Sequence, residues 1–124
     1  MTRFVPLPAV LAIHAEVIRD FGGRAGLRDG ALLESALARP RNREAYEGSD
    51  VFGLAAAYAY GIIRNHPFID GNKRVGFLCA FVFLSLNGFE LDAPEEEAVI
   101  VIEGVADGSV DEKTLAEWLR DHAS

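Results

Sequence analysis

Hydrophobic residues near the start of the chain recur at intervals of three and four, which is the spacing of an amphipathic helix. The pattern predicts a helix over residues 7–21, with these positions on its buried face: Leu7, Val10, Leu11, His14, Val17, Ile18 and Phe21. Pro8 suits the first turn of this helix, and the pair Gly22-Gly23 is typical of a helix end. His14 lies on the hydrophobic face, so we interpret it as a core histidine rather than a ligand.

A second helix is predicted after Asp29, whose side chain can cap the first turn. Its buried face would hold Leu32, Leu33, Ala36 and Leu37. We expect Pro40 to end this helix, because proline lacks the amide hydrogen that a helix interior requires. The polar, glycine-containing segment 41–49 is therefore expected to be a loop or flap.

Two hydrophobic helices are predicted in the middle of the chain. Asp50 can cap a helix over residues 51–64, and because apolar side chains surround its axis this helix must lie at the centre of the fold. Pro67 disfavours helix at His66 and indicates a turn there. The next helix, over residues 71–86, contains a long apolar run. These two helices should form a core hairpin with the turn at its elbow.

The last third of the chain predicts two more helices. Residues 92–95 have the pattern of a capping box, and acidic residues follow in the first turn. The run 99–102 has strand propensity, but we favour helix because of the cap and because no other strand could pair with it. Residues 109–112 should cap a final helix that buries Leu115, Trp118 and Leu119. The sequence as a whole predicts a single all-α domain over residues 1–124, with about six helices.

Composition and charge limit the classes of protein to which the chain can belong. Half of the 124 residues are hydrophobic, as in a compact globular domain, and the net charge of −7 argues against direct nucleic-acid binding. The one cysteine, Cys79, lies in an apolar run and is expected to be a core residue. No signal peptide is visible, and no apolar run approaches the length of about 20 residues that crosses a membrane. We expect a cytoplasmic protein without membrane contact.

The segment 66–74, HPFIDGNKR, carries the candidate chemistry. It contains one histidine, one carboxylate, one asparagine and two cations, and it leads into the apolar run. The backbone N–H groups at the start of a helix are unpaired, and the helix dipole favours an anion there. Because an imidazole also titrates near neutrality, the segment predicts a phosphate site with a general base beside it.

The string HPFIDGNKRVGF resembles the Fic family signature HPFx(D/E)GNGRxxR, and it is similar to the variant of the Doc branch, in which lysine replaces the second glycine. Lys73 matches that variant, whereas Phe77 stands where the longer Fic signature has its closing arginine. Residues 21–27, FGGRAGL, and the chain length also resemble Doc proteins.

The resemblance implies a role for each polar residue of the segment. His66 would be the general base. Without the polar residues that follow it, a histidine in a turn would be interpreted as structural. Asp70 would ligate Mg²⁺ that bridges the phosphates of ATP, although it could also cap the next helix. The predicted phosphate pocket comprises Gly71, Asn72, Lys73 and Arg74. Arg64, at the end of the preceding helix, is expected to contact phosphate as well. Phe68 is expected to anchor the loop in the core.

The resemblance implies a toxin of a toxin–antitoxin pair that transfers the γ-phosphate of ATP to a threonine hydroxyl of a translation factor, elongation factor Tu. By the same resemblance, Lys73 implies that ATP binds in the opposite sense to the ATP of AMP-transferring Fic proteins, so that the γ-phosphate is presented. AMP transfer to a protein hydroxyl and a catalytically idle antitoxin-binding module stay open as alternatives. Neither Glu47-Gly48 nor Glu103-Gly104 fits the inhibitory helix pattern of Fic proteins, since Arg43 and Val99 occupy the Ser/Thr position. We therefore expect control by a Phd-like antitoxin whose disordered segment folds into a groove between helices.

Overall fold

The computed structural model describes residues 1–124 and contains six helices. They are α1 (Leu7–Phe21), α2 (Gly30–Glu47), α3 (Val51–Asn65), α4 (Asn72–Leu86), α5 (Glu95–Asp107) and α6 (Glu112–Asp121). The only β pairing consists of two isolated bridges, between Leu27 and Phe68 and between Leu91 and Ala123. The predicted all-α fold is therefore confirmed.

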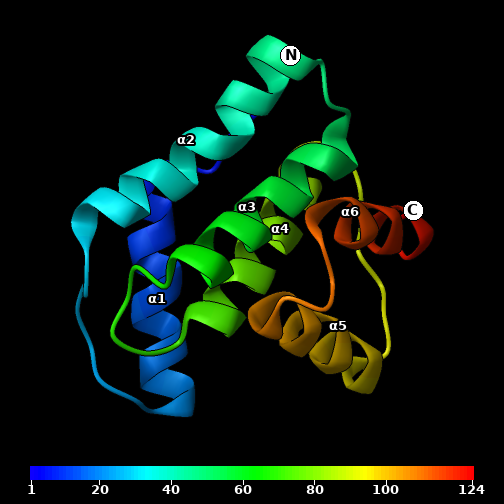
Figure 1. Ribbon diagram of the computed structural model, residues 1–124. Coiled ribbons are helices and arrows are strands. Elements are labelled where there is room, and N and C mark those ends of the chain that lie inside the picture. Colours follow the sequence, from blue (N-terminus) through cyan, green and yellow to red (C-terminus); the bar gives the residue numbers. More distant parts are fainter.

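Helix α3 is the centre of the fold. It packs against α2, α4, α5 and α6, whereas α1 packs against α4 (Figure 1). The predicted cap is present, because the Asp50 carboxylate accepts the Gly53 N–H. Gly61 lets α2 approach closely, since a Cβ at this position would lie 3.3 Å from the backbone of Ala36. The predicted core hairpin of α3 and α4 is confirmed, with residues 66–71 at its elbow.

The expectation that α2 ends at Pro40 is wrong, and so is the loop predicted for residues 41–47. The helix runs through the buried Pro40 to Glu47, and Gly48 ends it in a left-handed conformation. Two ion pairs hold the second half against α6, because both Arg39 and Arg43 contact the carboxylate of Glu112. These tertiary contacts offset the single hydrogen bond that proline removes.

The C-terminal helices confirm the predicted elements but not every detail. Residues 99–102 are helical within α5, whereas the predicted capping box is wrong: Pro94 is the N-cap and makes no side-chain cap bond. Asp111 caps α6 by accepting the Thr114 N–H. Trp118 is half-buried rather than buried, and its indole N–H donates to a carboxylate of α5. None of the helices is both long and apolar enough to cross a membrane.

Candidate functional site

The motif loop, residues 66–71, joins α3 to α4 and is defined by two left-handed residues. His66 caps the end of α3 with φ 52° and ψ 53°, and it is the only non-glycine residue with positive φ. Gly71, with φ 86°, precedes the first residue of α4. The turn that Pro67 predicts is thus present, with the chain reversing between the two central helices.

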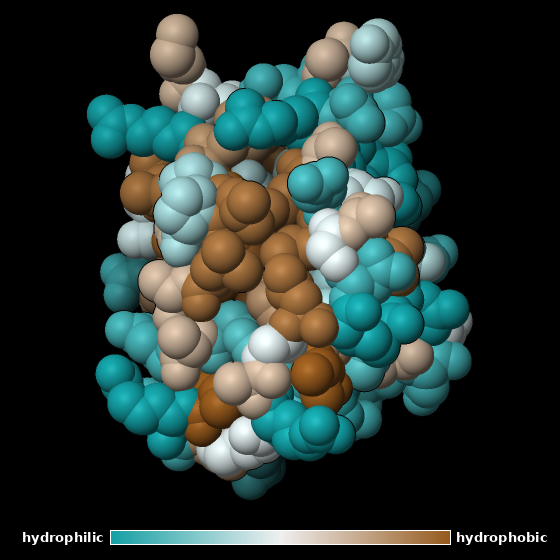
Figure 2. All heavy atoms as spheres, turned by 90° about the vertical axis from the view of Figure 1, so that its left-hand side faces the viewer, coloured by the Kyte–Doolittle hydropathy of each residue, from teal (hydrophilic) through white to brown (hydrophobic).

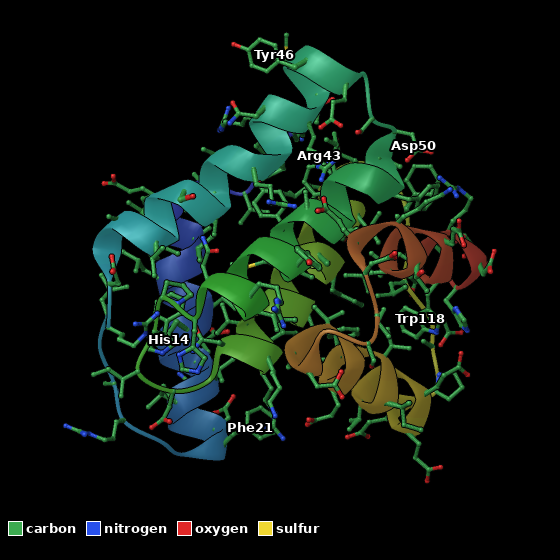
Figure 3. The ribbon with its side chains drawn as sticks, in the orientation of Figure 1. His14, Phe21, Arg43, Tyr46, Asp50 and Trp118 are labelled. Atoms are coloured by element: carbon green, nitrogen blue, oxygen red, sulfur yellow. The ribbon has the colours of Figure 1, made fainter.

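Phe68 anchors the middle of the loop in the core, as predicted. Its side chain is 1% exposed, and its ring stacks on His14 with the ring centroids 3.9 Å apart. His14 is buried, and its Nε2 lies 3.0 Å from the Asp70 carbonyl oxygen beside the motif loop (Figure 3). Since the neutral ring can donate this bond, His14 is a satisfied core histidine, as its place on the hydrophobic face suggested.

Asn72 differs from the sequence-based expectation. We expected its side chain to form part of a phosphate pocket, but the residue is 4% exposed and its amide is committed to Phe68. The Asn72 Oδ1 accepts the Phe68 N–H at 3.0 Å, and the Asn72 Nδ2 donates to the Phe68 carbonyl at 2.9 Å. In this structure Asn72 ties the loop to the first turn of α4.

His66 combines a constrained backbone with an exposed side chain. Its N–H donates to the Ile62 carbonyl, which closes α3, and its own carbonyl accepts from the Arg28 guanidinium. The imidazole is exposed and makes no hydrogen bond or ion pair with another side chain. An exposed imidazole at the end of a rigid helix can reach a hydroxyl on another protein.

Asp70 is half-buried and is oriented by the loop that follows α1. Its Oδ2 accepts the Arg24 N–H at 2.6 Å, while its Cβ would lie 3.1 Å from a Cβ at Gly23. The structure contains no cluster of three or more His, Cys, Asp or Glu side chains that could enclose a metal ion. Asp70 therefore stands as a single carboxylate beside the first turn of α4.

The cations predicted for the site are held by three different contacts. Lys73 Nζ lies 2.9 Å from a carboxylate oxygen of Glu103 in an exposed ion pair. The Arg74 guanidinium carbon lies 3.9 Å from the centre of the Phe21 ring. Arg64 donates to the carbonyls of residues 105 and 106, where α5 ends. Two of the three cations are thus attached to α5, which the sequence did not indicate.

A groove of about 390 Å³ adjoins the first turn of α4. Its apolar floor lies between a basic wall on α4 and an acidic wall on α5, and it is lined by Phe21, Lys73, Arg74, Phe77, Leu78, Glu95, Ala98, Val99, Ile102 and Glu103. Phe77, which replaces the closing arginine of the longer Fic signature, therefore contributes to the groove.

His66, Asp70 and Gly71 lie in the motif loop, which leads directly into the first turn of α4. Sequence reasoning missed the loop 22–29, which contacts the motif loop along its length. The string FGGRAGL gave a signal for it, since Gly23 and Gly26 both have positive φ and approach Asp70 and Ile69 closely.

The chain is similar in sequence to proteins of a known family. The family model for the Fic/DOC family matches residues 4–84, more than half of the chain. Over 120 residues the chain is 33% identical to the protein kinase doc of Escherichia phage P1, covering 95% of this chain and 94% of that protein. It is 40% identical over 77 residues to the toxin Doc of Mycolicibacterium smegmatis, covering 59% of this chain and 58% of that toxin.

A helical domain whose His-Pro-Phe turn leads into a buried central helix defines the class, and this chain belongs to the Fic/Doc family. Lys73 in the motif and the two relatives place it in the Doc branch of that family.

Proposed function

We propose that the chain is a toxin that transfers the γ-phosphate of ATP to a hydroxyl of a target protein. The observation that carries this proposal is Lys73, which puts a cation directly after Asn72 in the first turn of α4, in the same motif as the exposed His66. The similarity to the protein kinase doc over nearly its whole length supports phosphate as the transferred group. From the resemblance of the motif to the Doc branch, we propose a threonine of elongation factor Tu as the acceptor.

In the proposed reaction, His66 takes the proton of the acceptor hydroxyl as its oxygen attacks the γ-phosphorus. The bond between the γ-phosphorus and the β–γ bridging oxygen breaks, and ADP leaves with the electron pair. The first turn of α4 contains no acidic residue, so its free N–H groups and Arg74 can face phosphate oxygens. The exposed pair of Lys73 with Glu103 is worth only about 0–1 kcal/mol, so a phosphate can displace Glu103.

Asp70 suits a Mg²⁺ ion that is shared with a nucleotide. One of its carboxylate oxygens accepts the Arg24 N–H, and the other has no hydrogen-bond partner in the chain. Mg²⁺ is commonly held by one or two carboxylates together with phosphate oxygens and waters, and a single carboxylate fits that pattern. Bound there, Mg²⁺ would neutralise charge on the transferring phosphate.

Incubation of the purified chain with ATP, Mg²⁺ and elongation factor Tu, followed by intact-mass analysis of the factor, tests the transfer. We expect the mass to rise by one phosphate with the native chain and to stay unchanged with His66→Ala, whose circular dichroism should remain native because the side chain is exposed. Asp70→Asn should chiefly raise the Mg²⁺ concentration that is needed. An added AMP would replace the kinase proposal with AMP transfer.

We further propose that a Phd-like antitoxin restrains the site. The groove beside α4 has the apolar floor and charged walls that an amphipathic helix requires. Another apolar patch lies on the side of the molecule where α1 exposes Leu7, Leu11 and Phe21, and Figure 2 shows hydrophobic atoms gathered in the middle of that face. A disordered antitoxin segment that folds on binding could cover such surfaces.

Expression in a bacterial host tests this control. We expect the chain alone to arrest growth, and co-expression of a small protein encoded beside it to restore growth through direct binding. Harmless overexpression of the native chain in a host without that protein would contradict the toxin proposal. Growth arrest that His66→Ala does not relieve would point to an idle binding module.

A further inference from the structure

The loop 22–29, which joins α1 to α2, runs beside the motif loop and bonds to most of its residues. The contacts, in order along the motif loop, are Arg28 Nε to the His66 carbonyl, Arg28 N–H and Asp29 N–H to the Pro67 carbonyl, Ile69 N–H to the Gly26 carbonyl, and Arg24 N–H to the Asp70 carboxylate. The isolated bridge between Leu27 and Phe68 belongs to the same set. This segment is called the clamp loop below.

Arg28 is the only clamp-loop residue whose side chain donates hydrogen bonds to the motif loop and the end of α3. Its Nε donates to the His66 carbonyl at 2.7 Å, and one terminal nitrogen donates to the Asn65 carbonyl at 2.9 Å. These carbonyls lie at the C-terminus of α3, where helix carbonyls lack partners within the helix and a cation is favoured by the dipole. The planar guanidinium can bond both carbonyls at once, whereas a lysine ammonium has no such fork.

We propose that Arg28 is a positioning residue for His66. A non-glycine residue in the left-handed region persists only where its surroundings over-determine it, and His66 is the only such residue in the chain. Arg28 supplies this constraint by holding the carbonyls on both sides of the His66 Cα. The side chain of His66 is exposed and makes no hydrogen bond or ion pair of its own, so its direction depends on the conformation of its backbone.

This inference rests on the proposed function, because it assigns Arg28 to the geometry of the proposed general base. Arg28 lies outside the motif, and its hydrogen bonds go to the carbonyls of Asn65, His66 and Pro67 rather than to Asp70 or the first turn of α4. Its loss should therefore affect the proton-transfer step and leave nucleotide binding in place. A residue that served stability alone would lower the melting temperature without changing the rate of the folded enzyme.

The test compares Arg28→Ala, Arg28→Lys and the control Arg120→Ala, at a temperature where all three are folded. Arg120→Ala is a matched control because it also removes the contacts of a guanidinium group, here those with Asp50 and the Phe52 ring. These contacts involve no residue of the motif loop. Transfer from ATP is measured for kcat and for the KM of ATP. In parallel, NMR of the labelled chain reports whether His66 keeps its positive φ, a readout that needs no activity.

For Arg28→Ala we expect kcat to fall by up to about 10²-fold, the effect of a displacement of about 1 Å, with KM for ATP unchanged. His66 should lose its left-handed signature, and added guanidinium ion should restore part of kcat. The kcat of Arg28→Lys should lie between the native value and that of Arg28→Ala, and Arg120→Ala should keep the native kcat. A native kcat and a native His66 φ in Arg28→Ala would overturn the proposal, as would an equal loss in Arg120→Ala.

The NMR arm separates this proposal from the kinase proposal. If the native chain transfers phosphate to no protein, the proposed function fails, yet loss of the His66 conformation in Arg28→Ala still shows that Arg28 positions His66. If the native chain is active and His66 keeps its conformation without Arg28, the positioning role alone fails.

Discussion

Replacing Asn72 by alanine tests whether this residue holds the motif loop or binds phosphate. The change leaves the buried Phe68 N–H and carbonyl without the partners that the Asn72 amide supplies. An unsatisfied buried group costs about 1–3 kcal/mol, so two such groups should lower the free energy of unfolding by about 2–4 kcal/mol, allowing for partial relief by water. For a domain of this size that corresponds to a fall in melting temperature of about 8–16 °C.

Thermal unfolding followed by circular dichroism measures this loss. Asn42→Ala is the matched control, because Asn42 lies exposed on α2 and makes no hydrogen bond through its side chain. The control should keep its melting temperature or gain slightly, since alanine has the higher helix propensity. If Asn72→Ala melts like the control and loses only its use of ATP, the structural role assigned to Asn72 is refuted.

Asn72→Asp adds a pH test at the same position. The introduced carboxylate would keep an acceptor for the Phe68 N–H but would face the Phe68 carbonyl without a proton to donate. Burial raises the pKa of a carboxyl group, and the protonated form can donate. Because the folded pKa lies above the unfolded value of about 3.9, the loss of stability relative to the native chain should be smallest below that pH and should grow as pH rises through the folded pKa. A deficit independent of pH would contradict this account.

Three further outcomes are expected. Gly76→Ala should destabilise the chain by about 1–3 kcal/mol, because the new Cβ would lie 2.8 Å from Ile63 Cγ1; Gly30→Ala, with no heavy atom within 4 Å, should be neutral in the same denaturant titration. Burial raises the pKa of the Cys79 thiol to about 12, so it should resist Ellman's reagent at mildly alkaline pH until the chain is unfolded. The backbone N–H that Asp111 accepts lowers the pKa of that carboxyl group, so the support it gives α6 is present above the ordinary value of about 3.9 and is lost as pH falls through the folded pKa. Amide exchange in the first turn of α6 should therefore speed up in acid, and Asp111→Asn should remove that dependence.

The helices and the motif loop could be predicted because local patterns determine them. The apolar periodicity, the caps at Asp29, Asp50 and Asp111 and the turn at Pro67 each act over a few residues. Pro40 misled the prediction because the contacts that offset it come from Glu112, far along the chain. Non-local contacts of this kind have no signature in a local pattern.

In the candidate site, too, the local features could be predicted from the sequence and the non-local contacts could not. The motif identifies His66 and Asp70, since their residue types and spacing carry the signal. It does not show that Asn72 turns inward to Phe68, because an asparagine at a helix start suits either role. Nor does it show that Arg28 reaches the end of α3, because this contact depends on how α1, α2 and α3 pack.

The long separation of the clamp contacts affects when the site can form during synthesis. The bonds that fix the motif loop join residues 38, 46 and 56 positions apart, from Arg28 to His66, from Arg24 to Asp70 and from His14 to Asp70. Contacts this distant form only after the intervening chain has collapsed, and α4 must also be present to supply Asn72. A nascent chain that ends before α4 contains His66 but lacks the Asn72 bonds that hold the motif loop, so the orientation of His66 is fixed only when the central hairpin closes.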